Sequence, residues 1–363
     1  IKDCLKIHRM TKDLNLKNFR MPGEWEPQKS VWIAWPYNKK DWPGMFKNIP
    51  MTIAEIITNL SLNQKVNLLI NKRKDKIKIK KILKKFKYKL KNITFHIIST
   101  DRIWLRDTGP IFLINKKKKV FLNLKFNAWA KYRDFKKDNK INDKIAKILK
   151  IEKIEPEVKI QKKYKKIVLE GGAIDVDGNG TILLTRECLL SKVQNRNPGV
   201  TKKVFENTIK TYLNIKNFIW LNKGIKGDDT HGHVDDISRF VSKDVIMTAI
   251  EKNKKDPNYK NLRENLSILK KSKNVSGKKF KIIKIPMPKP MFIKKIRVPA
   301  SYLNFYIANK IVLLPIFKDK NDDKVILIFK KFFKKRKIVP INCRDLIWGF
   351  GAIHCLTQQE PKN

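Results

Sequence analysis

Apolar and polar residues alternate along the chain in short blocks with two different periods. Short apolar or alternating runs predict β-strands, because successive side chains of a strand point to opposite faces of a sheet. The predicted strands are Val31–Trp35, Val66–Ile70, Ile93–Ile98, Ile111–Ile114, Val120–Phe126, Ile167–Leu169, Thr181–Leu184, Phe218–Leu221, Val245–Ile250, Phe280–Ile285, Tyr302–Ala308, Ile311–Ile316 and Ile338–Ile341. Apolar residues three or four positions apart predict helices at Met51–Leu62, Ile77–Leu90, Val204–Leu213, Tyr259–Leu269 and Asp322–Phe333.

The order of these elements predicts an α/β fold. A pair of strands, a helix and a single strand follow one another several times, which indicates layers with mixed parallel and antiparallel pairing. Turn residues predict hairpins at Asp177–Gly180 and Asn309–Lys310, and Thr201 is placed to cap the helix after it. A doubly wound dinucleotide-binding fold is disfavoured, since no Gly-x-Gly-x-x-Gly opens a helix. No Pro- or Gly-rich linker divides the chain, so we expect a single domain over residues 1–363.

Composition excludes several classes of protein. Hydrophobic content of 42% with 8 Trp and 19 Phe excludes a disordered chain, and no apolar run is long enough to predict a membrane span. The first residues show no apolar core of a secretory signal. The four cysteines, Cys4, Cys188, Cys343 and Cys355, lack the spacing of a disulfide framework or a zinc motif. We therefore expect a cytoplasmic protein with free thiols.

The net charge of +50 suggests a polyanion as a partner, but the kind of basic residue argues against it. Only 13 of the 83 basic residues are Arg, the residue that nucleic-acid recognition favours for its planar fork. A uniform excess of Lys indicates a solvated surface instead. We expect a small-molecule ligand and no nucleic-acid or membrane partner, and we leave open whether copies of the chain associate.

Two of the polar clusters place a carboxylate beside an apolar run. Asp107 lies in the segment Trp104–Pro110, just before a predicted strand, where it either projects into a cleft or caps the turn and pairs with Arg106. Glu170 ends another predicted strand and is followed by two glycines, which permit close approach of the backbone. A carboxylate at the end of a buried strand is costly unless it is paired or used in chemistry.

A third cluster carries histidine and aspartate two residues apart. On a strand His233 and Asp235 would point to the same face, and an imidazole beside a carboxylate suits general acid/base catalysis. His231, His233 and Asp235 also form a His-x-His-x-Asp run, which makes a metal-dependent hydrolase the sharpest alternative. Such sites need further ligands, and the chain has only 5 His, so we expect no metal.

Cys355 lies in a C-terminal segment where small residues would let a substrate approach its sulfur. A buried structural cysteine is the alternative, but polar residues follow directly. If the clusters converge, one thiol and one imidazole meet the carboxylates of Asp107, Glu170 and Asp235. So many carboxylates suit a planar cation such as guanidinium, which presents N–H donors in a fixed fork. The expected chemistry is attack of sulfur on the guanidinium carbon without a cofactor.

Ten short motifs, taken in their order along the chain, resemble agmatine deiminases of the guanidino-group-modifying, or pentein, superfamily, which also includes arginine and bacterial-type peptidylarginine deiminases. The motifs are Met21–Pro27, Trp32–Pro36, Asp41–Gly44, Trp104–Pro110, Leu169–Gly172, Glu187–Leu190, Asn195–Pro198, Gly227–Asp235, Ala300–Ala308 and Ile353–Gln359. The resemblance implies a pentein fold, a five-bladed α/β propeller of ββαβ units with pseudo-fivefold symmetry around a central active site.

The resemblance also implies a mechanism. Cys355 matches the nucleophile of the family, His233 its general acid/base, and Glu170 the carboxylate that partners the histidine. The thiolate would attack agmatine, His233 would protonate the departing ammonia, and water would release N-carbamoylputrescine from a covalent thiouronium. No metal or organic cofactor is implied.

Substrate-binding residues follow from the same resemblance. Asp107 and Asp235 would hold the guanidinium group, and Trp104 would form a wall of the pocket. The chemistry of agmatine, rather than the resemblance, adds one more expectation: its far end is a primary ammonium group, which needs a carboxylate or carbonyl, and we expect Asp228 or Asp229 to supply it.

The sequence departs from the family beside the nucleophile. Phe350 and Ala352 stand where many agmatine deiminases have Gly and Asn, which leaves the substrate open. Free or peptidyl arginine would need a cation for its carboxylate or backbone end, and Arg106 and Arg239 are the candidates.

Overall fold

Small mixed sheets dominate the structure. The structure is a computed structural model that describes residues 15–161 and 163–363. Cys4 and His8 therefore lie outside the described residues. Five sheets share one pattern, in which an antiparallel pair of strands precedes a helix and a third strand that runs parallel to the second. The predicted α/β class with mixed pairing is therefore confirmed.

The five modules follow the chain, except that the last strand joins the first. The first contains β20 (Gln358–Pro361), β1 (Gln28–Ala34), α2 (Ile49–Ser61) and β2 (Lys65–Ile70), extended by α3 (Asp75–Leu83) and β3 (Ile93–Ile97). The second contains β4 (Ile111–Ile114), β5 (Lys119–Leu122), α5 (Ile141–Leu149) and β6 (Lys153–Ile154). The third contains β9 (Asp175–Val176), β10 (Thr181–Thr185), α6 (Arg186–Leu190), α7 (Lys202–Leu213) and β11 (Asn217–Leu221).

The remaining modules and two hairpins complete the chain. The fourth module contains β12 (Ser238–Ser242), β13 (Val245–Ile250), α8 (Asn258–Lys271) and β14 (Lys281–Pro286). The fifth contains β17 (Tyr306–Ile307), β18 (Ile311–Ile316), α9 (Asp322–Phe332) and β19 (Lys337–Asn342). The hairpins are β7 (Glu157–Ile160) with β8 (Lys163–Lys166), and β15 (Met291–Ile293) with β16 (Ile296–Val298).

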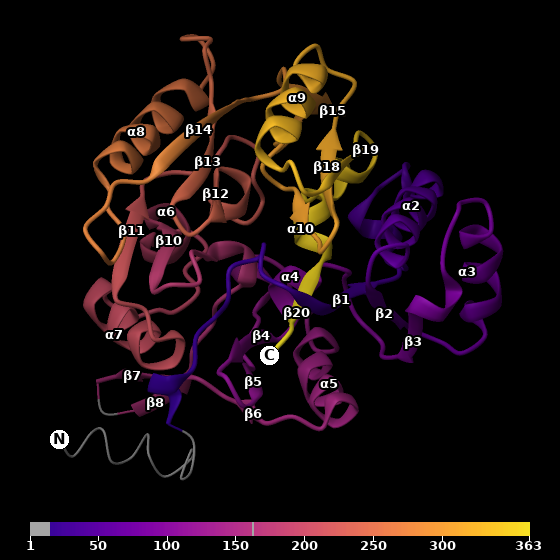
Figure 1. Cartoon of the computed structure of the whole chain (residues 1–363), viewed down its shortest axis with the longest axis horizontal. Helices are drawn as coiled ribbons and strands as arrows, with labels where there is room; N and C mark the ends of the chain where they lie inside the picture. The colour runs from indigo at the N-terminus through magenta and orange to yellow at the C-terminus, as the bar shows by residue number, and fades with distance from the viewer. Residues whose placement is uncertain (1–14, 162) are drawn as a thin grey trace.

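The long helices lie at the periphery and two single-turn helices lie between the modules (Figure 1). These are α4 (Leu105–Thr108) and α10 (Ile353–Leu356), which pack against each other. The 3₁₀ turn Gly171–Ala173 contacts α4 and also the 3₁₀ turn Val234–Asp236. Segments from four distant parts of the sequence therefore meet at the middle of the molecule.

Helix predictions held where the apolar spacing is regular. Helix α2 buries Ile53, Ile56, Ile57 and Leu60 on one face. Thr201 caps α7 as predicted, because its hydroxyl accepts a hydrogen bond from the Val204 amide. Both predicted hairpins are present, between β9 and β10 and between β17 and β18.

Several predicted elements were wrong or too long, each for a local reason. Helix α3 ends at Leu83, before the predicted Leu90, because the apolar residues that follow alternate instead of keeping helical spacing. The run Ile167–Leu169 forms only an isolated bridge, since the Asn197 side chain bonds both the N–H and the C=O of Val168 (2.9 and 2.7 Å).

The strand expected at Tyr302–Ala308 is reduced to Tyr306–Ile307. In the turn before it, the carbonyl of Asn304 accepts a hydrogen bond from the amide N–H of His354 (3.0 Å). His233 and Asp235, which would share a face on a strand, lie instead at the turn Val234–Asp236. There the Asp228 carboxylate accepts the amides of Gly232 and His233 (2.7 and 3.0 Å), so these groups are not available to a sheet.

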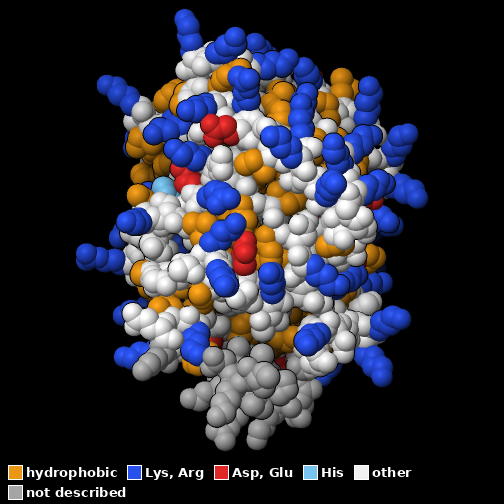
Figure 2. Space-filling model, turned by 90° about the vertical axis from the view of Figure 1, so that its left-hand side faces the viewer, with side chains coloured by type: hydrophobic (Ala, Val, Ile, Leu, Met, Phe, Trp, Pro, Cys, Tyr) orange, Lys and Arg blue, Asp and Glu red, His pale blue; other side chains and the backbone are white. Residues whose placement is uncertain are grey.

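Lysine and arginine side chains spread over the face shown in Figure 2, interspersed with apolar and neutral residues and a few acidic groups. None of the helices in the described part of the chain has the length and apolarity needed to cross a membrane.

Candidate active site

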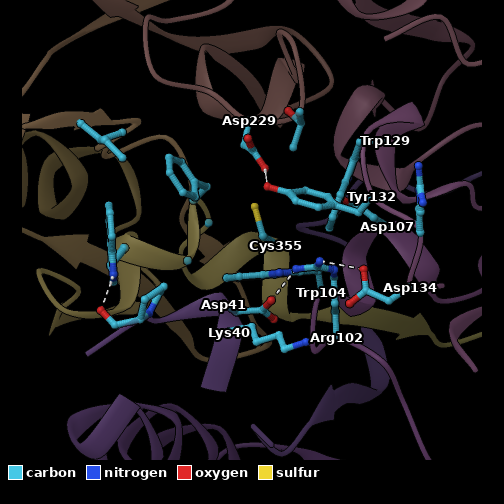
Figure 3. A pocket seen from close by; sticks show the side chains of 18 residues that line it. Lys40, Asp41, Arg102, Trp104, Asp107, Trp129, Tyr132, Asp134, Asp229 and Cys355 are labelled. Carbon is cyan, nitrogen blue, oxygen red and sulfur yellow. Dashed lines mark hydrogen bonds and ion pairs between the residues drawn. The ribbon is translucent and has the colours of Figure 1, made fainter. Parts of the chain in front are cut away.

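A cavity of about 690 Å³ opens at the centre of the molecule, and the sulfur of Cys355 lies on its wall (Figure 3). Aromatic side chains line much of it: Trp104, Trp129, Tyr132, Trp348 and Phe350. Four aspartates also face it, Asp41, Asp107, Asp134 and Asp229. An aromatic cavity with convergent acidic groups is suited to an extended organic cation.

Asn304 fixes the position of Cys355 at the end of α10. Its side-chain oxygen accepts the amides of His354 and Cys355 (3.0 and 3.2 Å), and its side-chain nitrogen donates to the Cys355 sulfur (3.1 Å). The thiol is 5% exposed, so it faces the cavity from within the core. In the sequence, the polar residues after Cys355 argued against a buried cysteine. That argument is wrong, because Thr357 and Gln358 are themselves buried and donate hydrogen bonds to backbone carbonyls.

Asp235 lies beside this thiol. Its Oδ2 is 3.8 Å from the Cys355 sulfur and 2.7 Å from Nδ1 of His354, whose Nε2 reaches Glu24 (2.8 Å). Burial alone raises the pKa of Asp235, but the hydrogen bond and charge of His354 outweigh burial and lower it. Its other oxygen, Oδ1, is buried without a hydrogen-bond partner in the described chain. Asp235 is therefore held ionised with one oxygen free for a ligand.

Asp107 approaches from α4 rather than from a turn at the start of a strand. The indole N–H of Trp129 donates to its Oδ2 (2.9 Å), and the amide of Gly172 donates to its Oδ1 (3.0 Å). The alternative of a pair with Arg106 is wrong, because Arg106 turns away to Glu24. Burial raises the pKa of Asp107 to about 6, although nearby His233 opposes the rise.

Gly172 shows how tightly the polar groups converge. A β-carbon at this position would lie 2.6 Å from Nδ1 of His233, 2.9 Å from Oδ1 of Asp107 and 3.2 Å from Oδ2 of Asp235. Only glycine leaves room for the three groups, which accounts for the Gly-Gly pair noted in the sequence.

His233 is buried between two carboxylates. Its Nδ1 lies 3.9 Å from Oδ1 of Asp107 and its Nε2 lies 3.6 Å from Oε2 of Glu170. Burial alone lowers its pKa, but Asp107, Cys188 and Glu170 together outweigh burial and raise it well above the usual range. In the folded protein this imidazole is held in a state that can donate a proton.

Arg196 stabilises the negative charge of the buried Glu170 carboxylate. Burial disfavours the ionised form, yet the Arg196 guanidinium, whose Nε donates to Oε1 (3.0 Å), and His233 together lower the pKa of Glu170 to about 2. Its Oε2 is buried without a hydrogen-bond partner among the described residues. The buried carboxylate is thus paired on one side and open toward His233 on the other.

The His-x-His-x-Asp run does not assemble into a metal site. His231 has a positive φ of 65° and its Nε2 lies 3.2 Å from the hydroxyl of Ser191. It contributes no atom to the group of neighbouring metal-ligand atoms found among the described residues, which is formed by Glu170, Cys188 and His233. The geometry disfavours the alternative of a hydrolase built on His231, His233 and Asp235.

The two expected partners of a distal ammonium group differ. Asp229 lines the cavity, where the hydroxyl of Tyr132 donates to it (2.6 Å) and Lys131 pairs with it. Asp228 instead bonds the amides of its own loop and does not line the cavity. Arg106 and Arg239, the candidates for meeting a substrate carboxylate, are buried in ion pairs with Glu24, outside the lining.

A family model for the Porphyromonas-type peptidyl-arginine deiminases matches residues 20–361. The chain belongs to this family. A family relative, the "Putative agmatine deiminase" of Legionella pneumophila strain Paris, is 34% identical over 349 residues, which cover 95% of this chain and 96% of the relative.

Family resemblance extends to solved structures. The agmatine deiminase of Enterococcus faecalis superposes with a TM-score of 0.85 at 30% identity, covering 95% of this chain and 96% of that one. A Cys-to-Ser variant of C. jejuni agmatine deiminase with substrate bound gives 0.83 at 30% identity, with the same coverage.

Several residues of the site were not singled out from the sequence. Four of them lie within the ten motifs, so their motif positions could have identified them as site residues: Glu24, Arg196, Asn304 and His354. Trp129 lies in none of them. Its contact with Asp107 depends on the turn Ala128–Ala130, where it has a φ of 57°, and no periodicity indicates that conformation.

Proposed function

We propose that this protein hydrolyses agmatine to N-carbamoylputrescine and ammonia through a covalent intermediate on Cys355. The observation that carries the proposal is the meeting of a thiol, an imidazole and three carboxylates beside one cavity. Among the described residues, Oδ1 of Asp235 and Oε2 of Glu170 are buried without a hydrogen-bond partner. The names of the relatives support agmatine as substrate.

Binding of the guanidinium group satisfies this arrangement. Its N–H groups can bond Asp235 on one side and Asp107 on the other, which places the central carbon against the sulfur of Cys355. Trp104 packs closely on Gly351 and forms a wall, since a β-carbon on Gly351 would lie 2.7 Å from its ring. A planar cation fits between such surfaces.

The substrate's own charge activates the nucleophile. Burial raises the pKa of the Cys355 thiol well above its usual range, and the negative charges of Asp235, Asp236 and Asp107 raise it further. A bound guanidinium cation neutralises these charges and favours loss of the thiol proton to solvent, which gives the thiolate. The thiolate then forms a bond to the guanidinium carbon, and a proton from His233 goes to the departing nitrogen as the C–N bond breaks and ammonia leaves.

Hydrolysis of the thiouronium uses the same groups in reverse. His233 accepts a proton from water, the oxygen bonds to the carbon, and the C–S bond breaks to return the thiol and N-carbamoylputrescine. Glu170, held ionised by Arg196, stabilises the protonated imidazole before the first step and again after the second.

The outer part of the cavity selects the far end of the substrate. Asp229 faces the cavity and is the proposed partner of the ammonium group of agmatine, which would compete with Lys131 for its carboxylate. Arg102 also lies there but is paired with Asp41 and Asp134.

We also infer that the five ββαβ modules are the blades of a pentein propeller, in a single domain. Their shared pairing pattern, and the return of β20 to pair with β1, support this arrangement.

A substrate panel of agmatine, free arginine and a peptidyl-arginine tests the proposal by ammonia release and ureido product. We expect agmatine to be preferred, with no loss of activity in EDTA. Cys355→Ser is expected to abolish turnover, while Cys343→Ser, which changes a buried thiol outside the site, should retain it. Ammonia release at the wild-type rate by Cys355→Ser would overturn the mechanism, and preference for arginine would overturn the substrate.

A further inference from the structure

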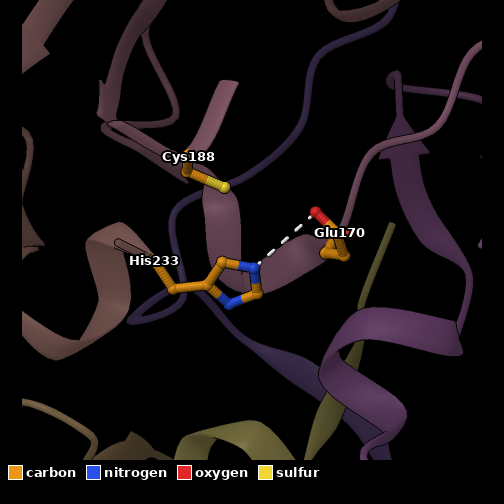
Figure 4. A group of neighbouring side chains, drawn as sticks. All are labelled: Glu170, Cys188 and His233. Atoms are coloured by element: carbon orange, nitrogen blue, oxygen red, sulfur yellow. Dashed lines mark ion pairs between the residues drawn. The ribbon is translucent and has the colours of Figure 1, made fainter. Parts of the chain in front are cut away.

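Cys188 is a buried thiol that the proposed reaction does not use. It lies on α6, and its sulfur, a ring nitrogen of His233 and a carboxylate oxygen of Glu170 are all within 4.8 Å of one another. Figure 4 shows the thiol and the carboxylate directed at the same edge of the imidazole, the edge that carries Nε2. Asp107 lies at the other edge, by Nδ1.

Two of the three groups direct toward each other a buried atom that forms an ion pair but no hydrogen bond. Oε2 of Glu170 and Nε2 of His233 are both buried and have no hydrogen-bond partner in the part of the chain that the structure describes. They lie 3.6 Å apart. Two ligands of one tetrahedral zinc ion are separated by roughly 3.4 Å, given zinc–nitrogen and zinc–oxygen bonds of about 2.1 Å. The spacing suits a bridging metal ion better than a direct hydrogen bond.

The surroundings resemble the outer shell of a metal site. Arg196 donates to the second oxygen of Glu170 (3.0 Å) and holds the carboxylate in place. The Asp107 carboxylate lies 3.9 Å from Nδ1, where it can orient the other edge of the ring. Asp107 lines the cavity and lies 3.9 Å from Nδ1 of His233, so the buried imidazole is adjacent to the cavity wall.

We propose that Glu170, Cys188 and His233 form an inhibitory binding site for a thiophilic divalent cation, of which Zn²⁺ fits best. Thiolate, imidazole and carboxylate are all ligands of Zn²⁺, and water can fill the fourth position. Binding releases the Nε2 proton of the imidazolium and the proton of the Cys188 thiol to solvent. The ion then occupies Nε2 and the remaining proton stays on Nδ1, so the ring can no longer accept a proton during hydrolysis. This consequence rests on the proposed role of His233, whereas binding itself does not.

Binding is tested first in the Cys355→Ser protein, so that the cavity thiol cannot supply the sulfur ligand. Co²⁺ serves as the probe, because a thiolate bound to it produces a charge-transfer absorption band. We expect one Co²⁺ per chain, displaced by Zn²⁺. The band should be lost when Cys188→Ser or Cys188→Ala is added, and retained when Cys343→Ser is added as a matched buried thiol.

Inhibition is tested separately with the wild-type protein and agmatine. Zn²⁺ should inhibit and EDTA should restore turnover. In Cys188→Ser the inhibition constant should rise at least about tenfold, since loss of even an outer partner of a metal site costs that much affinity.

A cobalt band that is absent from Cys355→Ser, or that persists in both Cys188 variants, overturns the proposal. The former result together with a band in the wild type would place the metal on Cys355 instead. If agmatine is not a substrate, the cobalt titration still decides whether the site exists.

Discussion

Replacing Asn304 by alanine tests how much of the nucleophile's reactivity depends on one amide. The side chain donates to the sulfur of Cys355 and is buried, with 1% exposure. A hydrogen bond to a charged group is worth roughly 1.5–3 kcal/mol, so its loss should lower kcat/KM by roughly 10- to 150-fold. The amide of Cys355 also loses its acceptor, which should cost about 1–3 kcal/mol of the free energy of unfolding. The His354 amide keeps the Asn304 carbonyl.

Two measurements separate reactivity from folding. Ammonia release from agmatine gives kcat/KM, and the rate of Cys355 alkylation by iodoacetamide, followed by mass spectrometry against pH, gives the pKa of the thiol. We expect this pKa to rise in Asn304→Ala, because the Asn304 hydrogen bond lowers it.

Asn309→Ala is the matched control, since Asn309 bonds the N–H and C=O of Gln28 (both 2.8 Å) away from the cavity. It should lower stability but leave the alkylation profile unchanged. If Asn304→Ala keeps kcat/KM within about twofold of the wild type and shows the same alkylation profile, the assigned role of Asn304 is wrong.

Three further predictions concern the buried charges. Asp107 must be ionised to hold guanidinium, and because its pKa is raised to about 6, kcat/KM should fall as the pH drops through that value; a pH–rate profile that stays flat there contradicts this. Trp129→Phe removes a donor to the Asp107 carboxylate and should shift the same acid limb to higher pH, whereas an unshifted limb would show that this bond is dispensable. Arg196→Gln leaves the Glu170 carboxyl buried without its cation, so urea denaturation should show a loss of roughly 3–5 kcal/mol, and a loss below about 1 kcal/mol would contradict the pairing.

Local structure was predictable from the sequence where the apolar residues of a segment keep a single regular spacing or where turn residues separate two strands. The amphipathic spacing of α2 and the turn residues between β9 and β10 specify backbone conformation from neighbouring residues alone. Predictions failed where a side chain takes the backbone hydrogen bonds. Asn197, 29 positions away along the chain, does so at Val168, and Asp228 does so within its own loop at His233. Apolar content predicts burial, but it does not tell which polar group a buried amide will meet.

The residue types of the site were also readable. A cysteine, a histidine and several carboxylates in ordered motifs indicated chemistry on a guanidinium group before any contact was known. The family match agrees with that interpretation. The sequence did not distinguish Asp229, which faces the cavity, from its neighbour Asp228, which bonds its own loop.

The sequence alone therefore determined the α/β class, most of the long helices, two of the hairpins and the kinds of groups available for catalysis, because these depend on local spacing and on side-chain chemistry. The tertiary structure decided which groups meet. Asp107, His233 and Asp235 converge around Gly172, and Asn304 holds Cys355, only because the modules bring distant segments together. It also decided the charges of these groups, since the pKa of a buried carboxylate or imidazole is set by desolvation and by neighbours from other parts of the chain.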